Sequence, residues 1–343
     1  MTDLNRVIID ASVDRALRNI SREPRRTLRN LLDLGLLFAK TPMQKKFLQT
    51  VAEMLANDDS AYFDLAARVM RQMDREWLKN VCVNVGYEAC IVGARAISQA
   101  EEQENMYIPW SIRMCCGEEG LSPVSMEEIV WQSVQLGIHI FLLDDEGIDP
   151  ESLRELMEQY PKCTFFVMTQ PERLRHWDLS EMGLCRNLAL LLDYDAPGVE
   201  EFQQRLLDNR CVYGMYRCYN DDNAQEVVTE EALRDYTARQ TLVFVLSAAG
   251  DTSESARTMV RGVTETVRRG QRYPLILLDA DGDISDVERV ISQRPFVLRF
   301  DGQGDAHAMN WPREVPVANI HSIPLREILR QAAPRVKKEG ANG

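Results

Sequence analysis

The chain has 343 residues, of which 45% are apolar and 27% charged, as in an ordinary globular protein. Its net charge of −13 argues against non-specific binding to nucleic acid, which needs clustered Lys and Arg. No apolar run reaches the ~18 residues of a membrane span, and the N-terminus lacks the apolar core of a signal peptide. We therefore expect a cytoplasmic protein that contacts neither nucleic acid nor membrane, with its eight cysteines as free thiols.

Residues 1–106 are predicted to form a region of helices only, because apolar residues recur there at helical spacing. The helices that carry this pattern cover residues 4–20, 24–37, 42–55, 62–77 and 80–100. Helices 24–39 and 80–100 hold more apolar residues than one buried face can use. We expect this region to contact a protein partner or a second copy in a homo-oligomer.

From residue 107 to 333, apolar strands alternate with capped helices. The strand candidates are 108–114, 138–143, 163–168, 187–192, 211–216, 241–246, 274–278 and 295–300. Helices are expected to begin at Ser125, whose Glu128 completes a capping box, and at Asp149, Thr229 and Ser253. Alternating strands and helices predict an α/β fold with a parallel sheet, and six or more such units favour a barrel. Residues 334–343 are expected to be a disordered tail.

The segment from Tyr107 to Ile148 carries a resemblance to a known family. Its strand IPWSIRM, its helix that ends at Gly137 and its second apolar strand form a βαβ unit. This unit resembles the opening of the radical S-adenosylmethionine (radical SAM) enzymes, in the group with a helical N-terminus and an IPW first strand. The resemblance implies a partial (βα)6 barrel of the TIM type.

In that family, a Cys-x-x-x-Cys-x-x-Cys loop after the first strand holds a [4Fe–4S] cluster. A Gly-Gly-Glu-Pro-like turn after the second strand receives S-adenosylmethionine. Here the loop from Cys115 to Val124 holds only Cys115 and Cys116, and the second strand ends in Asp144-Asp145-Glu146-Gly147. The cysteine of a C-terminal Asn-Gly-Asp-type hairpin is also missing from the counterpart, 300–311. The family frame is present without its cluster loop.

Polar residues follow the predicted strands, where active sites of barrels lie. Asp144, Asp145, Glu146 and Asp193 are expected to share one concavity, with Arg217 neutralising part of their charge. A carboxylate ring of this kind suits Mg²⁺ or Ca²⁺, but acidic residues after strands are also ordinary helix caps. Asp279–Asp283 lacks the spacing of an EF-hand and is predicted to be a turn, as is Asp301–Gly304 before an edge strand.

Reductive cleavage of S-adenosylmethionine requires three thiolates that leave one iron open. Cys115 and Cys116 are therefore weak metal candidates only, because adjacent residues of a strand point to opposite faces. We expect a catalytically degenerate radical SAM-like protein with no catalytic residues and no cofactor, which acts as a binding, partner or regulatory protein. The alternatives are an enzyme that reuses the acidic barrel mouth with a divalent metal, and a sensor that binds S-adenosylmethionine or a nucleotide without cleaving it.

Overall fold

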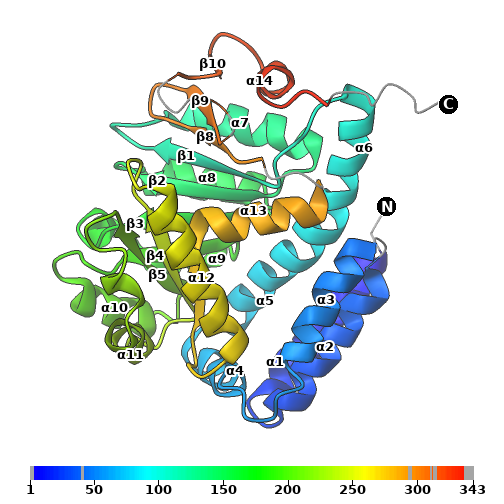
Figure 1. The fold of residues 1–343 in the computed structure, drawn as a ribbon, viewed down its shortest axis with the longest axis vertical. Helices are drawn as coiled ribbons and strands as arrows, with labels where there is room; N and C mark the ends of the chain where they lie inside the picture. Colours follow the sequence, from blue (N-terminus) through cyan, green and yellow to red (C-terminus); the bar gives the residue numbers. More distant parts are fainter. Residues whose placement is uncertain (1–3, 40–41, 293–295, 310, 312–314, 336–343) are drawn as a thin grey trace. The chain divides into compact units, whose positions relative to one another are not determined.

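The computed structural model describes residues 4–39, 42–292, 296–309, 311 and 315–335. The expected fold class is confirmed: a helical N-terminal region precedes strands that alternate with helices in a parallel sheet (Figure 1). The chain forms two compact units, each built from two segments. The first unit combines Met1–Val83 with Phe166–Asp283, and the second combines Asn84–Phe165 with Ile284–Gly343. The predicted boundary at residue 106 stays a prediction.

In its described residues, the first unit contains helices α1 to α5 of the N-terminal region and the strands from β3 to β7. Its N-terminal helices are α1 (Leu4–Ile20), α2 (Pro24–Phe38), α3 (Pro42–Met54), α4 (Tyr62–Gln72) and α5 (Arg75–Val83). Its strands are β3 (Thr164–Thr169, from Phe166 onward), β4 (Leu188–Asp193), β5 (Tyr213–Tyr219), β6 (Val243–Ala248) and β7 (Ile276–Asp279). The connecting helices are α9 (Leu179–Leu184), α10 (Val199–Asp208), α11 (Glu230–Ala238) and α12 (Glu254–Gly270).

Strands β3 to β7 lie in chain order, and β4 to β7 pair in parallel. Since parallel crossovers are right-handed, the helices between these strands cover one face. On a sheet face, Met168, Leu191, Tyr216 and Val245 form a buried apolar cluster. This succession of neighbouring βα units is the arrangement expected of a barrel wall.

Helices α4 and α5 are bound to the residues that precede the strands of the first unit. Arg68 donates hydrogen bonds to the carbonyls of Thr241 and Pro274, just before β6 and β7. The indole of Trp77 donates to the carbonyl of Leu188, the first residue of β4, at 2.7 Å. These hydrogen bonds join α4 and α5 to the sheet of the first unit.

The second unit begins with a π-helix (Asn84–Gly93) and α6 (Ala94–Glu104). It continues with β1 (Ser111–Cys116), α7 (Pro123–Leu136), β2 (Ile140–Asp145) and α8 (Pro150–Gln159). Helix α13 (Ala280–Ile291) leads into it, and β8 (Leu298–Phe300), β9 (Asp305–Ala308), β10 (Ala318–Asn319) and α14 (Leu325–Ala332) complete it. Strand order is β10-β9-β8-β1-β2; β1 pairs in parallel with β2 and β8, and β9 is antiparallel to β8. The turn predicted at Asp301–Gly304 joins β8 to β9.

Each strand begins one to three residues later than predicted. Apolar residues such as Ile138 and Cys163 are buried ahead of the strands, and the strands continue into polar residues that were expected to follow them. Asp144, Asp145 and Asp193 therefore lie in the last positions of β2 and β4. An apolar run in the sequence indicates which residues are buried, whereas a strand is defined by its backbone hydrogen bonds. At the ends of these strands, the buried residues and the hydrogen-bonded residues are not the same.

The N-terminus of α7 differs from its prediction. Ser122, not Ser125, is the N-cap residue, and its hydroxyl accepts the backbone N–H of Ser125 at 3.2 Å. Pro123 stands in the first turn, where its missing N–H costs nothing. The caps predicted at Asp149, Thr229 and Ser253 are confirmed. The helix predicted over 62–77 is also divided, since Asp74 accepts the N–H of Trp77 and starts α5.

The segment Arg75–Glu104 is a continuous run of 30 helical residues that would be long and apolar enough to cross a membrane. Half of its most apolar window is buried inside the protein, as in the core helix of a soluble protein, so the feature is weak evidence for a span. Gly93 makes a close backbone contact: a Cβ there would lie 2.4 Å from the carbonyl oxygen of Gly137. Gly86 has no such neighbour.

The C-terminal end of the described chain is hydrogen-bonded to the segment that precedes β1. The N–H of Arg335 donates to the carbonyl of Asn105, and Met106 forms an isolated bridge with Pro334. The predicted disordered tail, 334–343, lies outside the described residues from 336 onward.

Two buried carboxyl groups hold the IPW segment. Glu101 of α6 accepts the N–H of Ile108 at 3.0 Å, and Glu288 of α13 accepts the N–H of Trp110 at 2.5 Å. Burial raises the pKa of Glu101 to about 7 against its ordinary 4.5, and burial raises the pKa of Glu288 well above the ordinary value. Each group therefore keeps its proton to a higher pH in the folded chain than in the unfolded chain.

We predict that the free energy of unfolding falls as pH rises from 4.5 through about 7. The sign follows because the folded pKa lies above the unfolded one, so the stabilisation is complete at low pH and is lost on deprotonation. For Glu101 the difference corresponds to about 3 kcal/mol. Urea unfolding at several pH values measures it, and Glu101→Gln, which keeps the acceptor oxygen, should flatten the profile. A Glu101→Gln profile as steep as the wild-type one would contradict this assignment.

Candidate functional site

The loop after β1 is hydrogen-bonded through its main chain to the turn after β2. The N–H groups of Glu118 and Glu119 donate to the carbonyls of Gly147 and Glu146, at 3.1 and 3.2 Å. The N–H of Glu146 donates back to the carbonyl of Cys116 at 2.7 Å. The two loops that carry the cluster and the ligand in the resembling family are thus joined directly to each other.

Glycines make this contact as close as a polypeptide allows. Gly117 has a φ of +128°, and a Cβ there would lie 2.5 Å from the backbone of Glu146 and Gly147. From the β8–β9 turn, a Cβ on Gly302 would lie 2.8 Å from the carbonyl oxygen of Glu119. Three loops of the second unit therefore meet by backbone contact, without space for a side chain at these points.

The two adjacent cysteines lie in different surroundings. Cys116 is completely buried, and burial raises the pKa of its thiol well above the ordinary 9.0. Cys115 is partly exposed, and burial, followed by the carboxylates of Glu146 and Asp144, raises the pKa of its thiol too. Both groups are held as thiols, and thiolates are what a cluster requires.

Asp144 is neutralised by arginines of its own unit. Arg113 donates to both of its carboxylate oxygens, with Nε–Oδ2 and Nη2–Oδ1 distances of 2.8 Å. Arg299 of β8 approaches Oδ2 at 3.8 Å. Cys115 stands opposite Asp144 in the β1–β2 register, so Arg113, Cys115 and Asp144 share one face of the sheet. The sequence signal for this ion pair is Arg113, the one charged residue in the strand IPWSIRM.

Asp145 and Glu146 stabilise the turn after β2. Asp145 is buried, and its Oδ1 accepts the N–H groups of Gly147 and Ile148, both at 2.9 Å. Glu146 contributes its backbone to the contact with the β1 loop. The oxygens expected to face a ligand are therefore engaged in local hydrogen bonds at Asp145 and in the ion pair at Asp144.

Asp193 and Arg217 belong to the first unit, so their place in one concavity with Asp144 stays a prediction. Burial raises the pKa of Asp193, which accepts a long hydrogen bond of 3.4 Å from Gln170. Arg217 forms ion pairs with Asp195 at 2.8 Å and with Glu226 at 2.9 Å. Asp195 and Glu226 are the carboxylates that Arg217 neutralises.

The end of β7 also differs from the prediction. Asp279–Asp283 is the start of helix α13 and not a free turn, because Asp283 accepts the N–H of Asp279 at 2.8 Å. The Tyr219 hydroxyl donates to Asp279 at 3.3 Å. Burial, together with the neighbouring Asp281 and Asp283, raises the pKa of Asp279 to about 6. Its surroundings are those of a structural carboxyl group in a helix cap.

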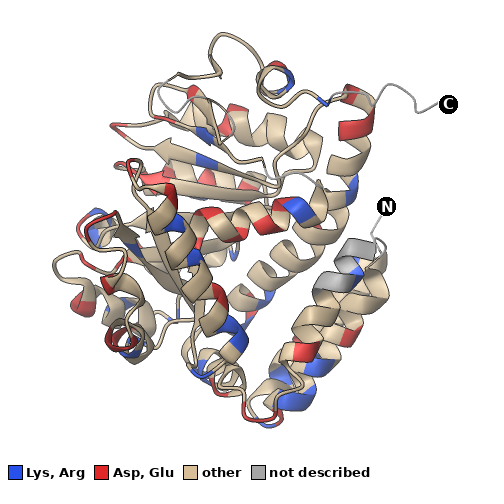
Figure 2. Cartoon of the chain, in the orientation of Figure 1, with Lys and Arg blue, Asp and Glu red and all other residues tan. Residues whose placement is uncertain are grey.

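Among the described residues, no three His, Cys, Asp or Glu side chains lie together in a way that could hold a metal ion. His139 is buried beside the carbonyl of Gly137, at 2.8 Å from Nδ1, as expected of a core histidine. Figure 2 shows acidic residues along loops that follow the strands. Their oxygens act mainly as helix caps and ion-pair partners, as at Asp149 and Asp195.

No protein-family model and no curated protein matches this chain. Among solved structures, it is similar to SuiB of Streptococcus suis, in two crystal structures at 9% sequence identity. The one bound to S-adenosylmethionine has a TM-score of 0.47 and covers 70% of this chain and 68% of its own. The other has a TM-score of 0.48 and covers 88% and 81%. A protein of Aquifex aeolicus VF5 has a TM-score of 0.32 at 11% identity, over 59% of this chain and 96% of its own.

We predict that Gly117→Ala destabilises the second unit by about 2 kcal/mol, since it combines a left-handed φ with a backbone clash. Gly250→Ala is the matched control, because a Cβ there has no neighbour within 4 Å. Urea unfolding of both variants compares them. Equal midpoints would show that the two loops separate easily and would contradict the tight backbone contact.

Proposed function

We propose that this chain is a catalytically degenerate radical SAM-like protein that acts by binding a protein partner and not by cluster-dependent chemistry. The observation that carries the proposal is the main-chain contact between the β1 loop and the β2 turn. In the resembling family these loops hold the cluster and the methionine end of the ligand. Here the two loops are hydrogen-bonded to each other, and a Cβ at Gly117 would lie 2.5 Å from the backbone of Glu146.

The residues present do not fit a [4Fe–4S] cluster. A cluster with one open iron needs three thiolates, whereas this loop offers two adjacent cysteines, one completely buried. Protein electrostatics alone cannot supply the chemistry of that cofactor. The divalent-metal alternative has little support in the carboxylates, because both Asp144 and Asp145 accept hydrogen bonds from the protein itself.

The N-terminal helices support the binding role. Helix α2 contains six leucines, and none of them is buried in the chain; its buried residue is Thr27. Leu37 is 81% exposed. Apolar residues left half-covered on a helix are typical of a surface that another protein covers. We propose a cytoplasmic location for this role, in keeping with eight cysteines that are all free.

The test of the degenerate site is anaerobic reconstitution with iron and sulfide. We expect no stoichiometric cluster and no charge-transfer absorbance in the visible range. A cluster of about four irons per chain that disappears in Cys115→Ala, and persists in the control Cys218→Ala, would overturn the proposal.

A second measurement concerns S-adenosylmethionine itself. Because the glycines of the family turn are replaced by Asp144 and Asp145, and Asp144 is held by Arg113, we predict a dissociation constant weaker than about 10 μM, roughly −7 kcal/mol. Isothermal titration calorimetry of the purified chain measures it. Tighter binding would favour the sensor alternative, and Asp144→Gly with Asp145→Gly should strengthen binding if the two side chains are what closes the site.

A further inference from the structure

Helix α1 presents an exposed apolar stripe. Leu4, Val7 and Ile8 are 70%, 49% and 46% exposed, and Ala11 is exposed as well. Residues at positions i, i+3, i+4 and i+7 lie on one face of a helix, so these four side chains form a continuous stripe. Arg15, one turn further along this face, is exposed and forms no ion pair within the described part of the chain. The stripe is thus an apolar surface with a cation at one end.

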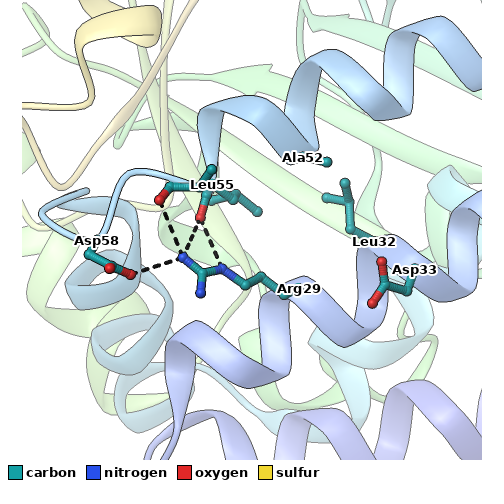
Figure 3. A pocket seen from close by; sticks show the side chains of 7 residues that line it. Arg29, Leu32, Asp33, Ala52, Leu55 and Asp58 are labelled. Atoms are coloured by element: carbon teal, nitrogen blue, oxygen red, sulfur yellow. Dashed lines mark hydrogen bonds and ion pairs between the residues drawn. The ribbon is translucent and has the colours of Figure 1, made fainter.

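Helices α2 and α3 form a pocket of about 440 Å³ in the same unit (Figure 3). Its apolar lining comes from Leu32 of α2 and from Ala52, Leu55 and Ala56 at the end of α3. The two helices are joined by a short connection and lie side by side (Figure 1). A hollow between two such helices is a surface into which a third helix can insert apolar side chains.

The charges in this pocket favour a basic occupant. Arg29 is already used within the chain: it donates to the carbonyl of Leu55 at 3.1 and 3.0 Å and pairs with Asp58 at 3.0 Å. Asp33 lines the same pocket, is exposed, and forms no ion pair with any described residue. The pocket therefore offers an apolar floor and an unpaired carboxylate, which complement the apolar stripe and Arg15 of α1.

We propose that the protein partner is a second copy of this chain, with the α1 stripe of each copy in the α2–α3 pocket of the other. The proposal rests on the binding role proposed above and names the partner. A two-fold axis uses both surfaces twice, so the assembly closes as a dimer and exposes neither surface.

Sedimentation velocity of the full chain over a concentration series tests this dimer. We expect a reversible monomer–dimer equilibrium. Ile8→Glu places a charge in the apolar stripe and should weaken dimerisation at least about tenfold, as loss of an interface anchor does. Ala52→Trp fills the pocket and should have the same effect. Circular dichroism should show both variants folded, because both positions are at least partly exposed in the single chain.

The matched control is Leu184→Glu in α9, which is 74% exposed and lies away from both surfaces in sequence. It should leave the equilibrium unchanged. A wild-type chain that is monomeric at every concentration would overturn the proposal. So would a dimer that Ile8→Glu and Ala52→Trp leave intact, or one that Leu184→Glu disrupts to the same extent.

A charge exchange gives the sharpest test. Asp33→Arg and Arg15→Asp each place like charges together in a homodimer, so each variant alone should be mostly monomeric. In an equimolar mixture of the two variants, a heterodimer has two contacts between a stripe and a pocket. One contact pairs native Arg15 with native Asp33, and the other pairs the two exchanged residues. Dimers should therefore return in the mixture, and their absence would contradict this pairing.

Iron content measured on the same samples separates the two proposals. A monomer without iron overturns only the dimer. An iron–sulfur cluster in a dimeric chain overturns the degenerate site and leaves the interface in place.

Discussion

The main-chain contact between the β1 loop and the β2 turn is the constraint on which the second unit depends. It links the carboxyl ends of two neighbouring parallel strands through the N–H groups of Glu118, Glu119 and Glu146. Backbone N–H and C=O groups that are removed from water must form hydrogen bonds within the protein, and here the groups of the two loops bond to each other. Glycine at position 117 is required by this contact, because any side chain would meet the turn.

The acidic groups at the two ends of β1 are stabilised in different ways. At the carboxyl end, Asp144 forms an ion pair with Arg113 on the same face of the sheet. Near the amino end, Glu101 and Glu288 accept backbone N–H groups while deeply buried, and their pKa values rise. A carboxylate with an arginine neighbour keeps its charge, whereas a carboxyl in an apolar site keeps its proton. Both kinds of interaction fix the position of β1 in the sheet.

The N-terminal helices have two distinct relations to the rest of the first unit. Helices α4 and α5 are bound to it by long side chains, with Arg68 and Trp77 donating to carbonyls that precede the strands. Helix α2 instead leaves its leucines only half covered. Burial of such side chains is worth about 25 cal/mol per Å² of apolar surface. Association with a partner would remove this apolar surface from water and so be favourable. This is the physical reason why more apolar residues than one buried face can use point to association.

The alternation of apolar strands with capped helices was sufficient to predict the α/β class, because hydrophobic period and cap residues are local properties. The caps at Asp149, Thr229 and Ser253 show this. Strand ends, the cap at Ser122 and the helix start at Asp279 were missed, because hydrogen bonds between distant or competing groups decide them. The partners of Asp144 and of Arg217 depend on strand register and on neighbouring loops. The role of a charged residue depends on which residue lies opposite it, and only the tertiary structure places that neighbour.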